Sequence, residues 1–150
     1  MRSNFEEAEF FVNHYRQIDK ESLSGPGSTI KNTSEVRELI QTFLNKNNIK
    51  SILDLGCGDW NWFNLLNLDD ASYLGWDADS DMINSNQINY GNTNVNFDAK
   101  DIVLDPYPQS DLIICRDVLF HMPIDMVLDI LNKIKKSYKY LISTSFREVD

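Results

Sequence analysis

The residues of this sequence that are best suited to bind a ligand are two glycines at the end of an apolar run. Gly56 and Gly58 follow the run Ser51–Leu55 and are separated only by Cys57. Because glycine has no side chain, it allows a tight turn and lets a ligand approach the backbone. The spacing is therefore typical of a cofactor loop at the end of a strand, although an ordinary strand-to-helix turn has the same pattern.

Acidic residues follow the next two apolar runs. Asp77 ends the second run, 21 positions after Gly56 (77 − 56), and a carboxylate at that spacing can accept hydrogen bonds from both hydroxyls of a ribose. Asp98 and Asp101 end the third run, where an acidic side chain and a backbone N–H can bind the edge of adenine. One such residue would more often cap a helix, but their recurrence at successive strand ends predicts an adenosine-binding site.

Asp54, two residues before the glycine loop, narrows the choice of ligand. The dinucleotide fingerprint G-x-G-x-x-G would require a third glycine where the chain has Asn61. That fingerprint also binds a pyrophosphate, which a neighbouring carboxylate would repel. A carboxylate suits a cationic amino group, such as that of S-adenosylmethionine. We therefore expect this cofactor and disfavour a nicotinamide-dependent oxidoreductase.

Candidates for catalysis follow the fourth apolar run. Methyl transfer from a sulfonium is an in-line displacement that depends on the placement of the nucleophile, and on a base where the nucleophile carries a proton. Asp117 and His121 are the candidate bases in that segment, and an imidazole can accept a proton near neutral pH. Each also has a structural interpretation, Asp117 as the cap of a helical turn and His121 as a half-buried residue before Pro123. Arg116 can bind a carboxylate substrate, but pairing with a neighbouring acid is favoured.

Five short apolar runs must hold these residues in place. They lack polar alternation, which indicates strands buried on both faces, and they alternate with helical patterns as in βαβ units. A helix is predicted from Ser34 with Thr33 as its N-cap, and another is predicted to open at Pro123. The sequence therefore predicts a doubly wound α/β fold with a mostly parallel, Rossmann-like sheet. The predicted strands are Ser51–Leu55, Ser72–Trp76, Asn94–Phe97, Asp111–Cys115 and Lys139–Thr144.

The region before the first strand has a different pattern. Residues 3–18 carry an apolar stripe at helical spacing, and residues 22–29 are rich in Ser, Gly and Pro, which predicts a loop. The hydroxyls and backbone N–H groups of that loop suit the carboxylate of the cofactor's amino-acid part. We divide the single domain into residues 1–32, an N-terminal helix and cofactor-covering loop, and residues 33–150, the S-adenosylmethionine-binding α/β core.

Composition and charge exclude several classes of protein. The net charge of −9 repels polyanions, so nucleic acid is disfavoured as a partner. The chain has no apolar stretch long enough for a membrane span and no N-terminal signal region. Cys57 and Cys115 are the two cysteines, and their spacing is not that of metal ligands, so no metal site is predicted. A reduced, cytoplasmic protein is the simplest interpretation.

The order of four segments resembles that of class I S-adenosylmethionine-dependent methyltransferases. The segments are DLGCG, GWDAD, FDAKD and DLIICRDVLFHM, and the last is similar in particular to small bacterial and phage-type methyltransferase-domain proteins. The resemblance extends from about Ser24 to Phe146. It implies that Gly56 and Gly58 contact the amino-acid part of the cofactor, with Asp54 near its ammonium group.

The same resemblance places the adenosine part of the cofactor. Asp77 would hold the ribose, while Asp98, Ala99 and Asp101 would surround the adenine, with either carboxylate as its partner. Trp60 is either pocket lining or, as is more common for an aromatic residue near a strand end, part of the core. The residues expected to bind the cofactor are Asp54, Gly56, Cys57, Gly58, Trp60, Asp77, Ala78, Asp98, Ala99, Asp101 and Arg116.

The sequence departs from the family pattern at two places. Many members have a third glycine in the first loop, where this chain has Asp59 and Trp60. The family's sheet usually has seven strands, whereas five are predicted here, so the last two are lacking and the fifth is an open edge. We expect that edge, residues 139–146, to bind a second copy of the chain or another partner.

These features favour a methyltransferase that acts on a small molecule or a side chain. The alternative is a non-catalytic protein or partner subunit that binds S-adenosylmethionine or S-adenosylhomocysteine. The missing strands favour the alternative, because that region often forms the substrate wall in this superfamily. Loss of turnover on substitution of Asp117 or His121 would distinguish the two.

Overall fold

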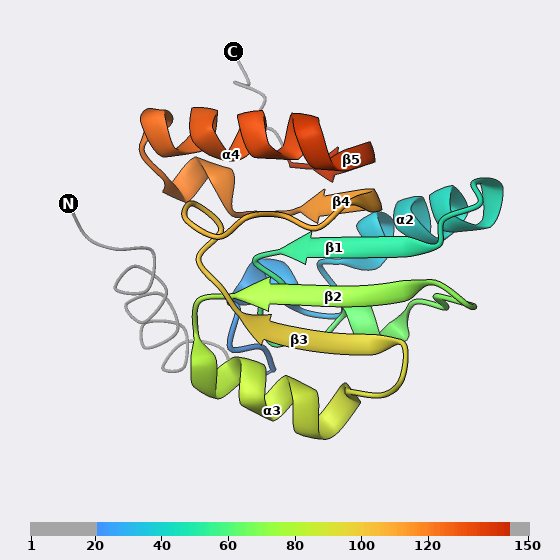
Figure 1. Cartoon of the computed structure of the whole chain (residues 1–150). Helices are drawn as coiled ribbons and strands as arrows, with labels where there is room; N and C mark the ends of the chain where they lie inside the picture. Colours follow the sequence, from blue (N-terminus) through green and yellow to red (C-terminus); the bar gives the residue numbers. More distant parts are fainter. Residues whose placement is uncertain (1–20, 145–150) are drawn as a thin grey trace, which may run out of the picture.

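The computed structural model describes residues 21–144, which form one five-stranded sheet flanked by helices (Figure 1). The strand order is β3-β2-β1-β4-β5, and all neighbouring strands are parallel. The predicted Rossmann-like α/β fold is thus confirmed, with every strand within two residues of its expected bounds. The strands are β1 (Ser51–Leu55), β2 (Ser72–Asp77), β3 (Val95–Ala99), β4 (Ser110–Cys115) and β5 (Tyr138–Ser143), and the α-helices are α2 (Ser34–Lys46), α3 (Ser80–Tyr90) and α4 (Ile124–Ser137).

Alternate residues of the central strand β1 enter two separate apolar clusters. Ile52 belongs to a cluster that includes Ile40 of α2 and Ile83 of α3. Leu53 belongs to the other cluster, with Ile130 of α4. The helices therefore cover the two faces of the sheet, and both faces of β1 are removed from water. This double burial explains why the strand sequences show no polar alternation.

Local chemistry explains where the helices begin. The carboxylate of Asp79 accepts a 2.9 Å hydrogen bond from the backbone N–H of Met82 and so caps α3. Thr33 occupies the predicted N-cap position of α2, but its hydroxyl donates to the carbonyl of Thr29 at 2.8 Å and makes no capping bond. The predicted capping interaction is therefore wrong, although the helix begins where expected. Pro123 precedes α4, as predicted.

Two of the four connections between strands contain no α-helix, contrary to the predicted alternation. Between β1 and β2 there is only the 3₁₀ helix Phe63–Leu65. The aromatic residues of this connection pack on the sheet, as Trp60 does against Tyr73. Between β3 and β4, the Asp101 carboxylate closes a turn by accepting two backbone N–H bonds. Packing and turn formation replace the helix in both connections.

The predicted helix over residues 3–18 lies outside the described residues. Among the helices of residues 21–144, none combines the length and the apolar character needed to cross a membrane. Within the described part of the chain, β5 pairs only with β4 and forms one edge of the sheet, as the sequence predicted for the fifth strand.

Candidate functional site

The glycine loop after β1 is joined to the end of the neighbouring strand. The backbone N–H groups of Gly56 and Cys57 donate hydrogen bonds to the carbonyl of Trp76, at 2.8 and 3.0 Å. Gly56 and Gly58 have φ values of 78° and 60°, in the left-handed region that favours glycine. The backbone of this turn therefore favours glycine at both positions.

The two glycines also allow other segments to approach closely. A β-carbon added to Gly56 would overlap the side chain of Val118, and one added to Gly58 would overlap the hydroxyl of Ser24. Val118 follows β4, whereas Ser24 comes from the region before α2. The glycine loop is thus the place where three segments distant in the sequence meet.

Asp77, at the end of β2, lies directly beside this loop. Its carboxylate accepts hydrogen bonds from the backbone N–H groups of Gly58 and Asp79, both at 3.1 Å. Burial raises the pKa of Asp77, and these N–H bonds lower it in part. Because a carboxylate can accept about four hydrogen bonds, Asp77 keeps capacity for further donors. The adjacent Ala78 is buried.

Asp54 lies in the core beneath the loop and is only 4% exposed. The hydroxyl of Tyr73 donates a 2.7 Å hydrogen bond to its carboxylate. Burial raises the pKa of Asp54 to about 7, against the opposing effect of that hydrogen bond, while the charge of Asp77 raises it further and that of Arg116 lowers it. The structure thus places Asp54 in a buried pair with Tyr73, electrostatically coupled to Asp77.

The two carboxylates at the end of β3 have different surroundings. Asp98 and Ala99 are exposed, and Ala99 is in register with Asp77 on the adjacent strand. Asp101 is 5% exposed, and it accepts backbone N–H bonds of 2.7 and 3.2 Å from the turn that follows. The Asp101 carboxylate therefore already accepts hydrogen bonds from the backbone of the turn, whereas the Asp98 side chain is exposed to solvent.

Arg116 connects the end of β4 to the region before α2. Its guanidinium donates a 2.8 Å hydrogen bond to the carbonyl of Gly27 and lies 3.0 Å from the carboxylate of Asp117. The same group lies 5.3 Å from the ring centre of Trp62. The pairing with a neighbouring acid, favoured from the sequence, is present in the structure.

The two candidate bases occupy different positions. Asp117 has a φ of 55° and its backbone N–H donates a 2.8 Å bond to the hydroxyl of Thr144. A β-carbon on Gly27 would lie 3.5 Å from the Asp117 carboxylate, so this carboxylate adjoins the region before α2. His121 is exposed at the end of a 3₁₀ helix, with its ring centre 4.1 Å from that of Phe120. Asp117 is thus the candidate base nearer to the glycine loop.

Trp60 stands where many family members have the third glycine, and it keeps a left-handed φ of 58°. Its indole is buried and its Nε1 has no hydrogen-bond partner within the described part of the chain. Cys57 is also buried, and burial raises the pKa of its thiol well above the usual range, so the thiol stays protonated. Both side chains lie in the core next to the loop. The ring of Trp60 contacts those of Phe63, Tyr73, Tyr90 and Phe97.

Asp59 is a site residue to which the sequence analysis assigned no role. Its carboxylate accepts a local hydrogen bond from the Asn61 N–H at 3.3 Å, and further bonds from Ser22, Leu23 and Ser24. The last three partners precede it by 35 to 37 positions, so no local spacing links them to Asp59. The sequence offered one signal for this contact: an acidic residue directly after Gly58, together with the hydroxyl-rich loop at residues 22–29.

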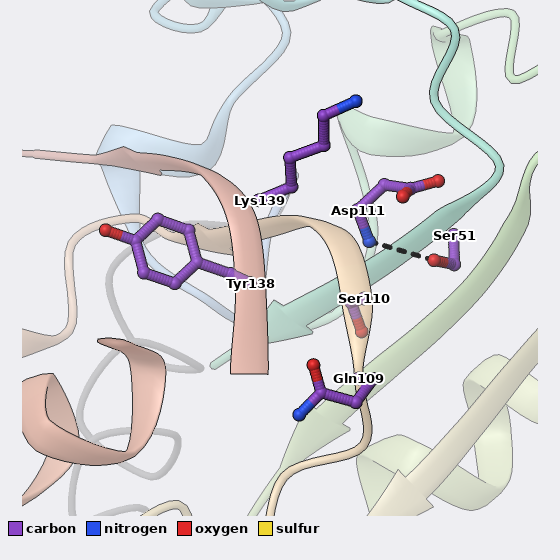
Figure 2. A pocket seen from close by; sticks show the side chains of 6 residues that line it. All are labelled: Ser51, Gln109, Ser110, Asp111, Tyr138 and Lys139. Atoms are coloured by element: carbon purple, nitrogen blue, oxygen red, sulfur yellow. Dashed lines mark hydrogen bonds between the residues drawn. The ribbon is translucent and has the colours of Figure 1, made fainter. Parts of the chain in front are cut away.

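A separate concave surface lies at the amino ends of the strands, away from the carboxyl ends that carry the candidate site (Figure 2). It encloses a volume of about 290 Å³ and is lined by polar residues at or just before the starts of β1, β4 and β5. Asp111 there accepts a 2.8 Å bond from the backbone N–H of Lys50 and donates its own N–H to the hydroxyl of Ser51 at 2.9 Å. Because ligands of parallel sheets bind beyond the carboxyl ends of the strands, this surface does not belong to the candidate site.

The strand order and the parallel pairing define a Rossmann-like α/β fold, and the methyltransferase structures with a similar fold place it in the class I methyltransferase type. The profile of a family described as a methyltransferase domain matches residues 29–148. Since the match covers well over half of the sequence, the chain belongs to this methyltransferase-domain family. None of the curated protein sequences compared with the chain matches it significantly.

Solved structures with a similar fold are methyltransferases. The magnesium protoporphyrin IX methyltransferase of Synechocystis PCC 6803 with bound S-adenosylmethionine has 22% identity and a TM-score of 0.57, over 71% of this chain and 56% of that one. The N-methyltransferase NodS of Bradyrhizobium japonicum WM9 in complex with S-adenosylhomocysteine has 13% identity and a TM-score of 0.69, over 91% and 68%. A bacterial Hen1 methyltransferase domain has 15% identity and a TM-score of 0.61, over 72% and 63%. At these identities the likeness shows a shared fold, and the chain spans just over half the length of the first of them.

Proposed function

We propose that the chain is an S-adenosylmethionine-dependent methyltransferase whose cofactor lies across the carboxyl ends of β1, β2 and β3. The observation that carries the proposal is the hydrogen bond from the Gly58 N–H to the Asp77 carboxylate. It joins the predicted glycine loop to the predicted ribose partner and leaves that carboxylate with acceptor capacity. The methyltransferase-domain family and the adenosyl ligands named for two structural neighbours support it.

The charge of the site fits this cofactor. The carboxylates of Asp59 and Asp77 lie at this edge, that of Asp54 lies in the core beneath it, and Arg116 is already paired with Asp117. Such an edge attracts the positive sulfonium and ammonium groups of S-adenosylmethionine and disfavours a pyrophosphate. When bound, this cofactor would supply an electrophilic methyl group, whose bond to sulfur breaks as the acceptor's lone pair forms the new bond.

Each part of the cofactor has proposed partners. The glycine loop, with Cys57 and Trp60 behind it, would form the floor under the amino-acid part, and Asp54 would supply negative charge from the core. Asp77 and Ala78 would hold the ribose. The adenine would lie against the end of β3, at Asp98, Ala99 and Asp101. Within the N-terminal segment 1–32, the described residues 21–32 would cover the cofactor held by the core, residues 33–150.

The end of β4 is the proposed place for the acceptor, a small molecule or a side chain. Asp117 would accept the acceptor's proton or orient its nucleophile, and Arg116 would hold that carboxylate in place through their 3.0 Å contact. His121 remains a second candidate base from the exposed 3₁₀ helix. Asp117→Asn tests the charge alone, because asparagine tolerates the left-handed backbone of this position.

A thermal melt with ligands tests the cofactor site. At 100 times the Kd, S-adenosylmethionine or S-adenosylhomocysteine should add about 2.7 kcal/mol of stability, a rise in Tm of roughly 5–10 °C, while NAD should produce none. The rise should be lost in Asp77→Asn and kept in Asp70→Asn, a change at an exposed carboxylate before β2. No shift for the folded wild-type chain would overturn the proposal.

Formation of S-adenosylhomocysteine distinguishes the enzyme from the non-catalytic alternative. It can be measured with a catechol, a primary amine and a lysine peptide as model acceptors. The proposal expects turnover with one acceptor class and a loss of at least tenfold in Asp117→Asn or His121→Ala, with cofactor binding retained. Tight binding without turnover on any acceptor would support the binding subunit. Full turnover in both variants would show that neither Asp117 nor His121 is the base.

We further propose that β5 pairs with a second copy of the chain through residues 139–146, of which 145 and 146 lie outside the described part. Among residues 21–144 the strand pairs only with β4, so its other side presents backbone groups without a partner in the described part of the chain. Sedimentation at increasing concentration should show a dimer. A monomer at all concentrations would contradict this pairing.

A further inference from the structure

A segment before α2 lies across the glycine loop and is held there by one carboxylate. We call residues 22–28 the strap. The Asp59 carboxylate accepts hydrogen bonds from the Ser22 hydroxyl at 2.9 Å, from the Leu23 backbone N–H at 2.7 Å and from the Ser24 hydroxyl at 3.2 Å. In return, the Asp59 N–H donates to the Ser24 hydroxyl at 3.0 Å.

The other end of the strap is held separately. The Asn61 side-chain amide donates a 3.1 Å hydrogen bond to the Ser28 carbonyl, and Arg116 donates a 2.8 Å bond to the Gly27 carbonyl. The strap therefore runs from the glycine loop toward the end of β4. The bonds to Asp59 are the charged contacts at its start, and hydrogen bonds to a charged group are stronger than neutral ones.

We propose that Asp59 is a positioning residue that holds the strap over the amino-acid part of the cofactor. This inference rests on the function proposed above. The strand order β3-β2-β1-β4 would place adenine at β3, the ribose at β2 and the amino-acid part at β1. The strap contacts the ends of β1 and β4, through Gly58 and Arg116, and so covers the end of the cofactor opposite the adenine.

The chemistry of the contact explains why an acid stands at this position. Four donors converge on one side chain, the three of the strap and the backbone N–H of Asn61 at 3.3 Å. A carboxylate offers about four acceptor positions, whereas an amide oxygen offers two. In Asp59→Asn, an amide N–H would face at least one of these donors and the negative charge would be absent. The variant keeps the size of the side chain, so the fold is retained while the strap is released.

The binding of two nucleosides separates this role from a general effect on the site. S-Adenosylhomocysteine contains the amino-acid part, whereas 5′-methylthioadenosine keeps the adenosine and the thioether but lacks it. By isothermal titration calorimetry, Asp59→Asn should raise the Kd of S-adenosylhomocysteine at least tenfold and leave that of 5′-methylthioadenosine within twofold of wild type. Ser24→Ala removes one donor to the Asp59 carboxylate and the acceptor of the Asp59 N–H, and it should have the same selective effect. Asp70→Asn should change neither Kd.

Amide hydrogen exchange of the ligand-free chain provides a second measurement. Residues 22–28 should exchange at least tenfold faster in Asp59→Asn, while the amides of β1 keep wild-type rates. Unchanged strap exchange, or an equal change in the Kd of both nucleosides, would overturn the role of Asp59 while the cofactor site stands. If the wild-type chain binds neither nucleoside, the proposed function fails and this inference fails with it.

Discussion

The hydroxyl of Tyr73 donates a 2.7 Å hydrogen bond to the carboxylate of Asp54 inside the core between β1 and β2. Burial raises the pKa of Asp54 to about 7 in spite of this bond. The folded chain therefore binds a proton at Asp54 between about pH 4 and pH 7, where the unfolded chain has released it. Over that range the free energy of unfolding decreases as the pH rises, and the contribution levels off above pH 7.

Asp54→Asn should remove this pH dependence. Asparagine keeps an acceptor for the Tyr73 hydroxyl and has no charge to bury. The free energy of unfolding of the variant, relative to that of wild type, should therefore increase by about 2–3 kcal/mol from pH 5 to pH 8. Urea unfolding at the two pH values measures the change. Because Asp77 also has a raised pKa, the comparison is between the slopes of the two proteins. Parallel slopes would show that Asp54 is not the group responsible.

Gly58→Ala should destabilise the chain, whereas Gly27→Ala should not. Alanine at Gly58 would adopt a φ of 60°, which costs about 1–2 kcal/mol, and its β-carbon would overlap the Ser24 hydroxyl. At Gly27, the added carbon would lie 3.5 Å from the Asp117 carboxylate, an ordinary contact. Urea unfolding should give a loss of about 2 kcal/mol or more for the first variant and less than about 0.5 kcal/mol for the control.

A double substitution separates the two costs at Gly58. Adding Ser24→Gly to Gly58→Ala removes the overlap but leaves the backbone strain, while Ser24→Gly by itself loses the hydrogen bonds with Asp59. The double variant should therefore lose less stability than the sum of the two single variants. A strictly additive result in this cycle would mean that Ser24 and Gly58 do not interact.

At Trp60, the glycine variant should be more stable than the alanine variant, which is the reverse of the usual order. Removing its buried ring costs about 3–5 kcal/mol, so both Trp60→Gly and Trp60→Ala should be less stable than wild type. At a φ of 58°, however, glycine is unstrained and alanine is not, so Trp60→Gly should be more stable than Trp60→Ala by about 1 kcal/mol. Thermal unfolding of the two variants measures the difference. The usual order, with alanine above glycine, would contradict the left-handed backbone of this residue.

The parts of the fold that the sequence predicted are those with a local pattern. Strands buried on both faces are continuous apolar runs, and Ile52 and Leu53 show why, since adjacent residues enter opposite clusters. It was also predictable that Asp77 and the glycine loop would lie close together, because the carboxyl ends of neighbouring parallel strands lie on the same side of the sheet. Asp77 therefore lies beside the glycine loop, as its spacing indicated.

The features that escaped prediction depend on distant contacts. The strap residues that donate to Asp59 lie more than 30 positions upstream, in a loop without periodicity. The connection after β1 contains no α-helix, and Trp60 there packs into an aromatic cluster that composition alone does not reveal. Likewise, Asp98 and Asp101 are the same residue type three positions apart, and only the turn that follows distinguishes them.

That difference between Asp98 and Asp101 leads to opposite expectations for their alanine variants. Asp101→Ala would leave two backbone N–H groups without their buried acceptor and should lower stability by about 1–3 kcal/mol. Asp98 is exposed, so Asp98→Ala should change stability by less than about 0.5 kcal/mol. If Asp98 is the adenine partner, its variant should also weaken 5′-methylthioadenosine at least fivefold. Calorimetry and urea unfolding on the same samples separate the two effects. Stability lost in Asp98→Ala, with Asp101→Ala unaffected, would reverse the assignment of the structural and the ligand-binding carboxylate.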